Sequence, residues 1–182
     1  MSEIQKAADV IKSGGVIAYP TEGVWGLGCD PFNETAVRRI CALKERPVEK
    51  GLILVAGTLE QTQAVTGSLA PEYMDLLWET WPGPNTWLVP DVDQVIPSWI
   101  KGQFETVAIR VSEHPLVVDL CLAAGGMIVS TSANPGEQPP ALNQDEVESY
   151  FPKGLDMILP GALGGLSGPS QIRDLMSQAV IR

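Results

Sequence analysis

The order of helical and strand patterns along the chain constrains its fold more than any other feature. Apolar residues recur at helical spacing from Ile4 to Ile11, and the run Val16–Tyr19 that follows two glycines is typical of a buried strand. The same change from helical to strand pattern recurs along most of the chain. We expect helices at 33–43, 71–81, 115–124 and 144–150, and strands at 52–56, 86–89, 106–111, 127–129 and 157–159, followed by a terminal strand pair.

This alternation predicts an α/β fold in which a twisted, open β-sheet is flanked by helices. Several connections are too short for a crossover between parallel strands, so we expect the sheet to be mixed. The length of 182 residues and a hydrophobic content of 45% fit one domain with an ordinary core. We therefore predict a single domain over residues 1–182, without repeats or linkers.

Missing patterns exclude several classes of protein. No apolar stretch approaches the roughly 18 residues of a membrane span, and the first residues lack a signal pattern, so we expect a soluble, cytoplasmic protein. The cysteines 29, 41 and 121 are too far apart in sequence to indicate a disulfide framework or a zinc site. The common nucleotide and metalloprotease motifs are absent, and the only histidine, His114, precedes a proline at an expected helix start. We assign no metal ligands, and no catalytic role to His114.

The formal net charge of −10 argues against general affinity for a polyanion. Nonspecific binding to nucleic acid depends on many contacts between phosphates and Lys or Arg. A local basic groove remains compatible with this charge.

Against this acidic background, three of the twelve cationic side chains fall within the segment Lys44–Lys50. Pro47 releases Lys44 and Arg46 from the preceding helix, and an apolar strand follows, an arrangement that often holds phosphate. Cations in the last turn of a helix also complement its dipole without any ligand. Both interpretations stay open for this segment taken alone.

A second candidate is Ser130–Asn134, where three hydroxyls and one amide follow an expected strand. Open α/β sheets bind ligands at the carboxyl ends of their strands, and such a turn can donate several hydrogen bonds to an anion. The alternative is a Ser/Asn turn that satisfies its own backbone.

Thr106 and Arg110 form the third candidate. Four residues of strand place both side chains on one face, about 13 Å apart. An arginine there can hold a carboxylate with its bidentate fork. Pairing of Arg110 with a surface glutamate is the alternative.

Six segments, taken in order, carry a resemblance to a known family. They are Tyr19–Gly28, Leu43–Pro47, Lys50–Leu54, Trp81–Thr86, Ala108–Arg110 and Ser130–Asn134. With them the chain closely resembles the YrdC/TsaC family of threonylcarbamoyl-AMP synthases, in its short bacterial form. The resemblance covers nearly the whole chain and implies a YrdC-like fold with a concave substrate-binding face.

The resemblance also implies a reaction and its partners. L-Threonine and bicarbonate form a carbamate, which attacks the α-phosphate of ATP to give L-threonylcarbamoyladenylate and pyrophosphate. The adenylate serves the N6-threonylcarbamoyl modification of adenosine 37 in tRNA, together with other tRNA threonylcarbamoylation proteins. Mg²⁺ is expected on the ATP phosphates, held mainly by substrate and water.

Site residues follow from the matching motifs. The implied ATP-binding residues are Lys44, Arg46, Lys50, Thr106, Ser132 and Asn134, with Lys44 and Arg46 as the catalytic cations, and the implied threonine-binding residues are Thr21, Arg110 and Ser170. Two departures from the family pattern stand out. Pro135–Glu137 follows Asn134, so we expect a different grip on phosphate, and the segment before Ser170 lacks the basic residues of close relatives.

Other functions remain as alternatives. The fold can present a groove to double-stranded RNA, tRNA or ribosomal RNA, as an RNA-binding module or ribosome maturation factor, and the net charge speaks against this. A nucleotide-binding domain that has lost catalysis is the other alternative, and the intact Lys44, Arg46, Ser132 and Asn134 speak against it.

Overall fold

The computed structural model describes residues 1–182. The helices are α1 (Glu3–Lys12), α2 (Glu34–Leu43), α3 (Gln63–Thr66), α4 (Pro71–Thr80), α5 (Ser98–Lys101), α6 (Pro115–Ala124) and α7 (Gln144–Tyr150), with the 3-10 turns η1 (Val48–Lys50) and η2 (Glu60–Thr62). The strands are β1 (Ile17–Pro20), β2 (Trp25–Gly28), β3 (Ile53–Ala56), β4 (Asn85–Pro90), β5 (Thr106–Val111), β6 (Ile128–Val129), β7 (Thr131–Ser132), β8 (Met157–Ile158) and β9 (Gln171–Asp174).

The strands form two mixed sheets, in the orders β7-β2-β1-β8 and β6-β3-β5-β4-β9. In the first sheet β1 pairs with β8 in parallel, and the other pairs are antiparallel. In the second sheet β3 pairs with β5 and β4 with β9 in parallel, and the other two pairs are antiparallel. The mixed α/β fold predicted from the sequence is confirmed, with its strands divided between two sheets.

The segment 128–132 passes from one sheet to the other. Its first half, β6, pairs with β3, and its second half, β7, pairs with β2. Between them the amide of Ser130 donates to the carbonyl of Ile53 at 2.8 Å, while the amide of Val129 donates to Cys29 at 3.0 Å. This crossing places the hydroxyl-rich turn predicted as a candidate site where the two sheets meet.

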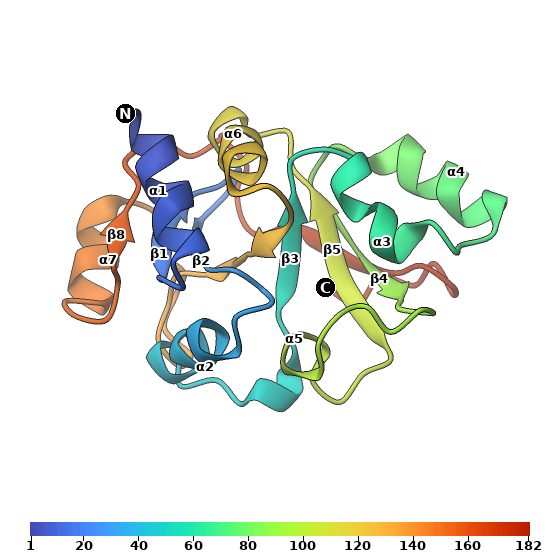
Figure 1. Ribbon diagram of the computed structural model, residues 1–182, viewed down its shortest axis with the longest axis horizontal. Coiled ribbons are helices and arrows are strands. Elements are labelled where there is room, and N and C mark those ends of the chain that lie inside the picture. Colours follow the sequence, from blue (N-terminus) through green and yellow to red (C-terminus); the bar gives the residue numbers. More distant parts are fainter.

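Helices pack around both sheets (Figure 1). Helices α1 and α6 pack against each other on one side of the molecule, whereas α2 and α5 lie on the opposite side. The helix predicted at 33–43 is α2, and Asn33 caps its start, because its side chain accepts a 3.0 Å hydrogen bond from the amide of Ala36. None of the helices is both long and apolar enough to span a membrane.

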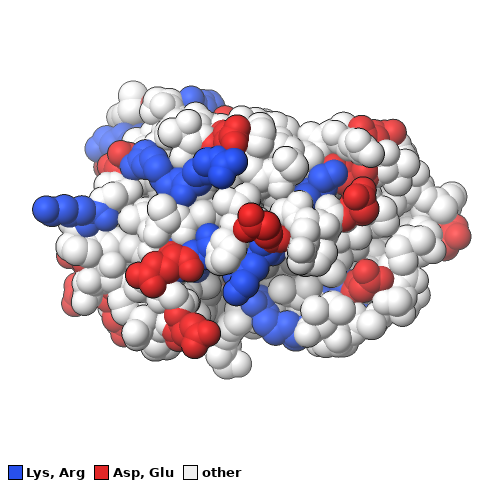
Figure 2. Space-filling model, turned by 90° about the horizontal axis from the view of Figure 1, so that it is seen from below, with Lys and Arg blue, Asp and Glu red and all other residues white.

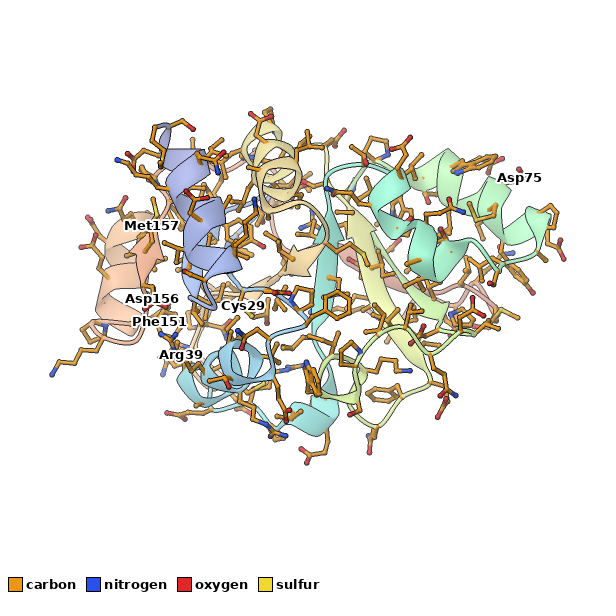
Figure 3. All side chains as sticks on the ribbon, viewed as in Figure 1. Cys29, Arg39, Asp75, Phe151, Asp156 and Met157 are labelled. Carbon is orange, nitrogen blue, oxygen red and sulfur yellow. The ribbon has the colours of Figure 1, made fainter.

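Two buried apolar clusters hold the elements together. The larger has 28 residues, among them Trp87 and Ile109 on neighbouring strands of the second sheet, and the smaller has 11, including Ile17 and Leu120. On the surface, Arg39 of α2 lies beside Asp156, with the closest nitrogen and oxygen 2.9 Å apart (Figure 3). Asp156 also accepts from the amide of Val16 at 2.7 Å, so this contact joins α2 to the start of the first sheet.

Strand β2 was not predicted, because its glycines hide the strand pattern. These glycines instead allow a close approach of the backbone. A Cβ atom on Gly28 would lie 2.7 Å from the ring of Tyr19 and 2.8 Å from the carbonyl of Val129. The predicted terminal strand pair is present only as β9 and an isolated bridge between Arg173 and Val180.

Candidate functional site

A cavity of about 550 Å³ is lined by residues of both sheets. Strands β2 and β7 contribute from the first sheet, and β3, β4, β5 and β9 from the second. The polar and charged side chains of the lining are Thr21, Glu22, Arg46, Lys50, Lys101, Thr106, Arg110, Ser130, Thr131, Ser132, Ser170 and Arg182. A volume of this size accommodates a nucleotide-sized ligand.

The cavity is basic although the protein is acidic. Glu22 is the single acidic side chain of the lining. The five cationic side chains of the lining are Arg46 and Lys50 after α2, Lys101 at the end of α5, Arg110 in β5 and Arg182 at the end of the chain. On the face seen from below, by contrast, basic and acidic side chains are interspersed (Figure 2). The positive charge is therefore concentrated in the cavity, where it can attract an anionic ligand despite the net charge of −10.

Lys44, the C-cap of α2, extends to the turn that follows β7. Its ammonium donates to the carbonyls of Ser132 at 2.5 Å and Asn134 at 3.2 Å, and to the Asn134 side-chain oxygen at 3.2 Å. Burial, with a smaller contribution from the charge of Arg46, lowers the pKa of Lys44 to about 8. Lys44 is 6% exposed and lies outside the cavity lining, directly behind Ser132.

The Ser132 hydroxyl lines the cavity and donates a 2.6 Å hydrogen bond to the Asn134 side-chain oxygen. The Asn134 amide group donates to the carbonyl of Gln138 at 2.8 Å, which closes the loop that contains Pro135–Glu137. The structure thus brings Lys44, Ser132 and Asn134 together, as the resemblance implied, and only Ser132 of the three reaches the cavity wall.

Arg46 and Lys50 line the cavity from the loop after α2. The chain reverses there through Glu45, whose φ is +52°. The Arg46 guanidinium donates to the carbonyl of Gly51 at 3.0 Å, and burial lowers its pKa. The loop therefore supplies two cations to the cavity, and the helix-end interpretation of this segment does not account for their position.

Arg110 is paired inside the protein, not with a surface glutamate. Its guanidinium lies 2.5 Å from a carboxylate oxygen of Glu22, and the Ser112 hydroxyl donates to the other oxygen, also at 2.5 Å. Burial raises the pKa of Glu22, but the charge of Arg110 and the hydrogen bonds from Ser112 and Arg110 outweigh it, so the pKa is lowered. Glu22 was not predicted as a site residue.

The predicted hydroxyl residues Thr21, Thr106 and Ser170 all line the cavity. The Thr21 hydroxyl donates to the carbonyl of Val24 at 2.7 Å, which leaves its oxygen available as an acceptor. The hydroxyls of Ser170 and Thr86 are hydrogen-bonded at 2.7 Å. Thr106 and Arg110 both face the cavity from β5, so the prediction that they share a face is confirmed.

Two further cations of the lining were missed by sequence reasoning. Lys101, at the end of α5, is 2.8 Å from Asp91, and Arg182 donates to the carbonyl of Ser170 at 3.3 Å. Burial and the charge of Arg46 lower the pKa of Arg182. The segment before Ser170 contains no cation that lines the cavity. Near Ser170 the cation of the lining is Arg182, at the end of the chain.

The glycine-rich loop 161–168 closes the cavity over the turn Thr21–Gly23. The amides of Gly164 and Leu166 donate to the carbonyls of Thr21 and Glu22, each at 3.0 Å. A Cβ atom on Gly23 would lie only 1.9 Å from the carbonyl oxygen of Gly168, so the two backbones touch. The loop thereby fixes the position of Ser170, which follows it.

Comparison with known proteins is consistent with this arrangement. The sequence model of the Sua5/YciO/YrdC family, described as "Telomere recombination", matches residues 9–182. Two proteins named "Threonylcarbamoyl-AMP synthase", from Stutzerimonas stutzeri and Pseudomonas aeruginosa PAO1, are each 56% identical to the chain. The first alignment covers 98% of this chain and 96% of the relative, and the second 98% and 95%.

Solved structures show the same fold. Sua5 of P. abyssi, complexed with L-threonine, has a TM-score of 0.88 at 31% identity over 96% of this chain. The chain spans about half of that protein, 52% of its length. E. coli YciO gives a TM-score of 0.83 at 25% identity, over 98% of this chain and 87% of its own. From the family match over nearly the whole sequence and the identity to its members, the chain belongs to the Sua5/YrdC family.

Proposed function

We propose that the protein is an L-threonylcarbamoyladenylate synthase, a nucleotidyltransferase that converts L-threonine, bicarbonate and ATP to threonylcarbamoyl-AMP and pyrophosphate. The observation that carries the proposal is the cavity, in which five cations and several hydroxyls surround a single, neutralised carboxylate. Relatives at 56% identity over nearly the full chain carry this name.

The residue types suit attack at an α-phosphate. In that step charge builds on the phosphoryl oxygens and pyrophosphate leaves, and both need fixed cations and hydrogen-bond donors. The proposal assigns ATP to the wall of the cavity formed by Arg46, Lys50, Ser132 and Thr106, which all belong to the lining. Lys44 supports this wall from behind through Ser132 and Asn134.

The amino-acid substrate is assigned to the part of the cavity around Arg110. The guanidinium can take the threonine carboxylate with its fork, and Thr21 and Ser170 offer hydroxyls nearby. The relative from P. abyssi was solved with L-threonine. Correct orientation of the reactants can recover about 7–11 kcal/mol of the barrier, so no side-chain nucleophile is needed.

Mg²⁺ fits this reaction as an ion brought by ATP. The one carboxylate of the lining, Glu22, has both oxygens engaged by Arg110 and Ser112. The chain thus leaves the ion's coordination to ATP phosphates and water, and Mg²⁺ neutralises charge on those phosphates. We further propose that the protein acts in the cytoplasm and supplies the adenylate to the other tRNA threonylcarbamoylation proteins, which use it to modify adenosine 37 of tRNA.

The experiment is incubation of the protein with ATP, Mg²⁺, bicarbonate and L-threonine. We expect pyrophosphate release that depends on threonine, together with an adenylate whose mass matches threonylcarbamoyl-AMP. Omission of bicarbonate or threonine is the control. The enzyme assignment is wrong if pyrophosphate is not released, or if its release is indifferent to threonine.

A further inference from the structure

The most unusual group in the cavity is the buried carboxylate of Glu22. Its side chain is part of the lining although the residue is only 5% exposed, and its two oxygens meet Arg110 and Ser112, which are 6% and 1% exposed. All three residues come together only in the folded chain, since Glu22 is 88 positions from Arg110. A buried carboxylate that is fully engaged in this way has a defined position.

The position of the Glu22 carboxylate is also fixed by Ser112 and the residues around it. The Ser112 hydroxyl, which donates to Glu22, accepts a 3.1 Å hydrogen bond from the amide of His114. The His114 ring is 2.9 Å from the carbonyl of Ala162 through Nε2, at the start of the glycine-rich loop. The backbone carbonyl of Glu22 accepts from Leu166 of the same loop. Strand β5 and the loop thus fix the carboxylate together.

The guanidinium of Arg110 makes one hydrogen bond within the protein, to Glu22 through Nη1. A guanidinium carries five N–H donors in a rigid plane, so fixing one edge fixes the direction of the others. Because Arg110 is part of the cavity lining, donors remain for a ligand carboxylate there. The bond to Glu22 therefore determines how Arg110 presents its fork.

We propose that Glu22 is a positioning residue, which orients Arg110 toward the carboxylate of the amino-acid substrate and does not itself exchange a proton with it. The inference rests on the proposed function for the identity of that substrate. A role for Glu22 as a base toward the substrate amine is disfavoured, because both oxygens already accept strong hydrogen bonds and the pKa of the carboxyl is lowered.

The test compares the wild type with Glu22→Gln in two measurements. Calorimetric titration with L-threonine gives the binding constant directly, and pyrophosphate release gives KM and kcat. For Glu22→Gln we expect threonine affinity to fall roughly tenfold or more and its KM to rise in parallel, with the KM for ATP and kcat at saturating threonine within about threefold of wild type. Glu22→Asp keeps the charge and should restore part of the affinity.

A matched control is Glu34→Gln. Glu34 also forms an ion pair with an arginine, Arg38, at 2.7 Å, but both side chains are exposed on α2. This variant should leave threonine binding unchanged. Ser112→Ala provides a milder change at the site, since it removes the hydrogen bonds of the hydroxyl with Glu22 and the amide of His114 but leaves both charges, and it should weaken threonine binding several-fold.

A double-mutant cycle tests whether Glu22 affects threonine affinity through Arg110. If Glu22 acts through Arg110, Glu22→Gln should cost little further threonine affinity in an Arg110→Lys background. Unchanged threonine affinity in Glu22→Gln and Ser112→Ala, a fall in kcat alone, or independent effects in the cycle would each overturn the inference. Threonine binding without any pyrophosphate release by the wild type would instead count against the proposed reaction, and the calorimetric comparison would still decide the role of Glu22.

Discussion

The ammonium of Lys44 donates a 2.5 Å hydrogen bond to the backbone carbonyl of Ser132, so a buried cation at the end of α2 holds the strand β7 in place. Arg46, two residues further, has its guanidinium in the cavity lining. The two cations of one motif therefore have different physical roles, one toward the protein and one toward the ligand. Their variants should differ accordingly.

Both Lys44→Ala and Arg46→Ala should abolish threonine-dependent pyrophosphate release, but only Lys44→Ala should strongly destabilise the fold. Removal of the ammonium leaves the carbonyl of Asn134 without a donor and the carbonyl of Ser132 with only the amide of Asn134, which costs about 1–3 kcal/mol. Arg46→Ala removes hydrogen bonds to the carbonyls of Lys50 and Gly51, but Lys50 is exposed and Gly51 half-buried, so water can replace the guanidinium there. Thermal unfolding of the two variants beside the wild type measures the difference, and equal melting temperatures for both would contradict it.

Much of the architecture was predictable because its signals are local. The helix α2 and its Asn33 cap, the strand β5 and the hydroxyl-rich turn before Asn134 each follow from short stretches of sequence. The family resemblance added which of these segments meet at one site. The structure places the predicted Arg46, Ser132 and Arg110 in the same cavity.

The features that were missed depend on contacts between distant parts of the chain. Glu22 follows the predicted Thr21 directly, but its pairing with Arg110 exists only because the two sheets meet. Arg182 reaches Ser170 through the pairing of the last residues with Ile172. The sequence predicted a terminal strand pair, but not that this pairing brings a cation to the cavity. Strand β2 was concealed by Gly26 and Gly28, which are poor strand formers by propensity.

The lowered pKa of Lys44 predicts how stability depends on pH. The native state loses this proton near pH 8, whereas the unfolded chain holds it up to the ordinary value of 10.5. Between these values the unfolded state binds more protons, so the contribution of Lys44 to stability rises with pH. The difference in unfolding free energy between wild type and Lys44→Met, measured by urea titration from pH 7 to 10, should grow across this range. A constant difference would show that Lys44 titrates normally.

The contact between Gly23 and the glycine-rich loop predicts a large effect of one methyl group. In Gly23→Ala the Cβ atom would overlap the carbonyl oxygen of Gly168 at 1.9 Å, so the loop must move and Ser170 with it. We expect a loss of about 1–3 kcal/mol of stability and a rise in the KM for threonine. Gly126→Ala is the control, since a Cβ there meets nothing within 4 Å. Wild-type kinetics in Gly23→Ala would mean that the loop position does not matter for the site.

The distribution of charge predicts that the protein binds ATP far better than tRNA. Five of its twelve cationic side chains line a cavity of about 550 Å³, which an RNA duplex cannot enter, and the net charge of −10 repels a polyanion. Filter binding of labelled tRNA should show no measurable affinity even at low salt, while ATP binding by calorimetry should be readily detected and should weaken in Arg46→Ala. Tight tRNA binding that declines steeply with salt would reveal a phosphate-binding surface outside the cavity and favour the RNA-binding alternative.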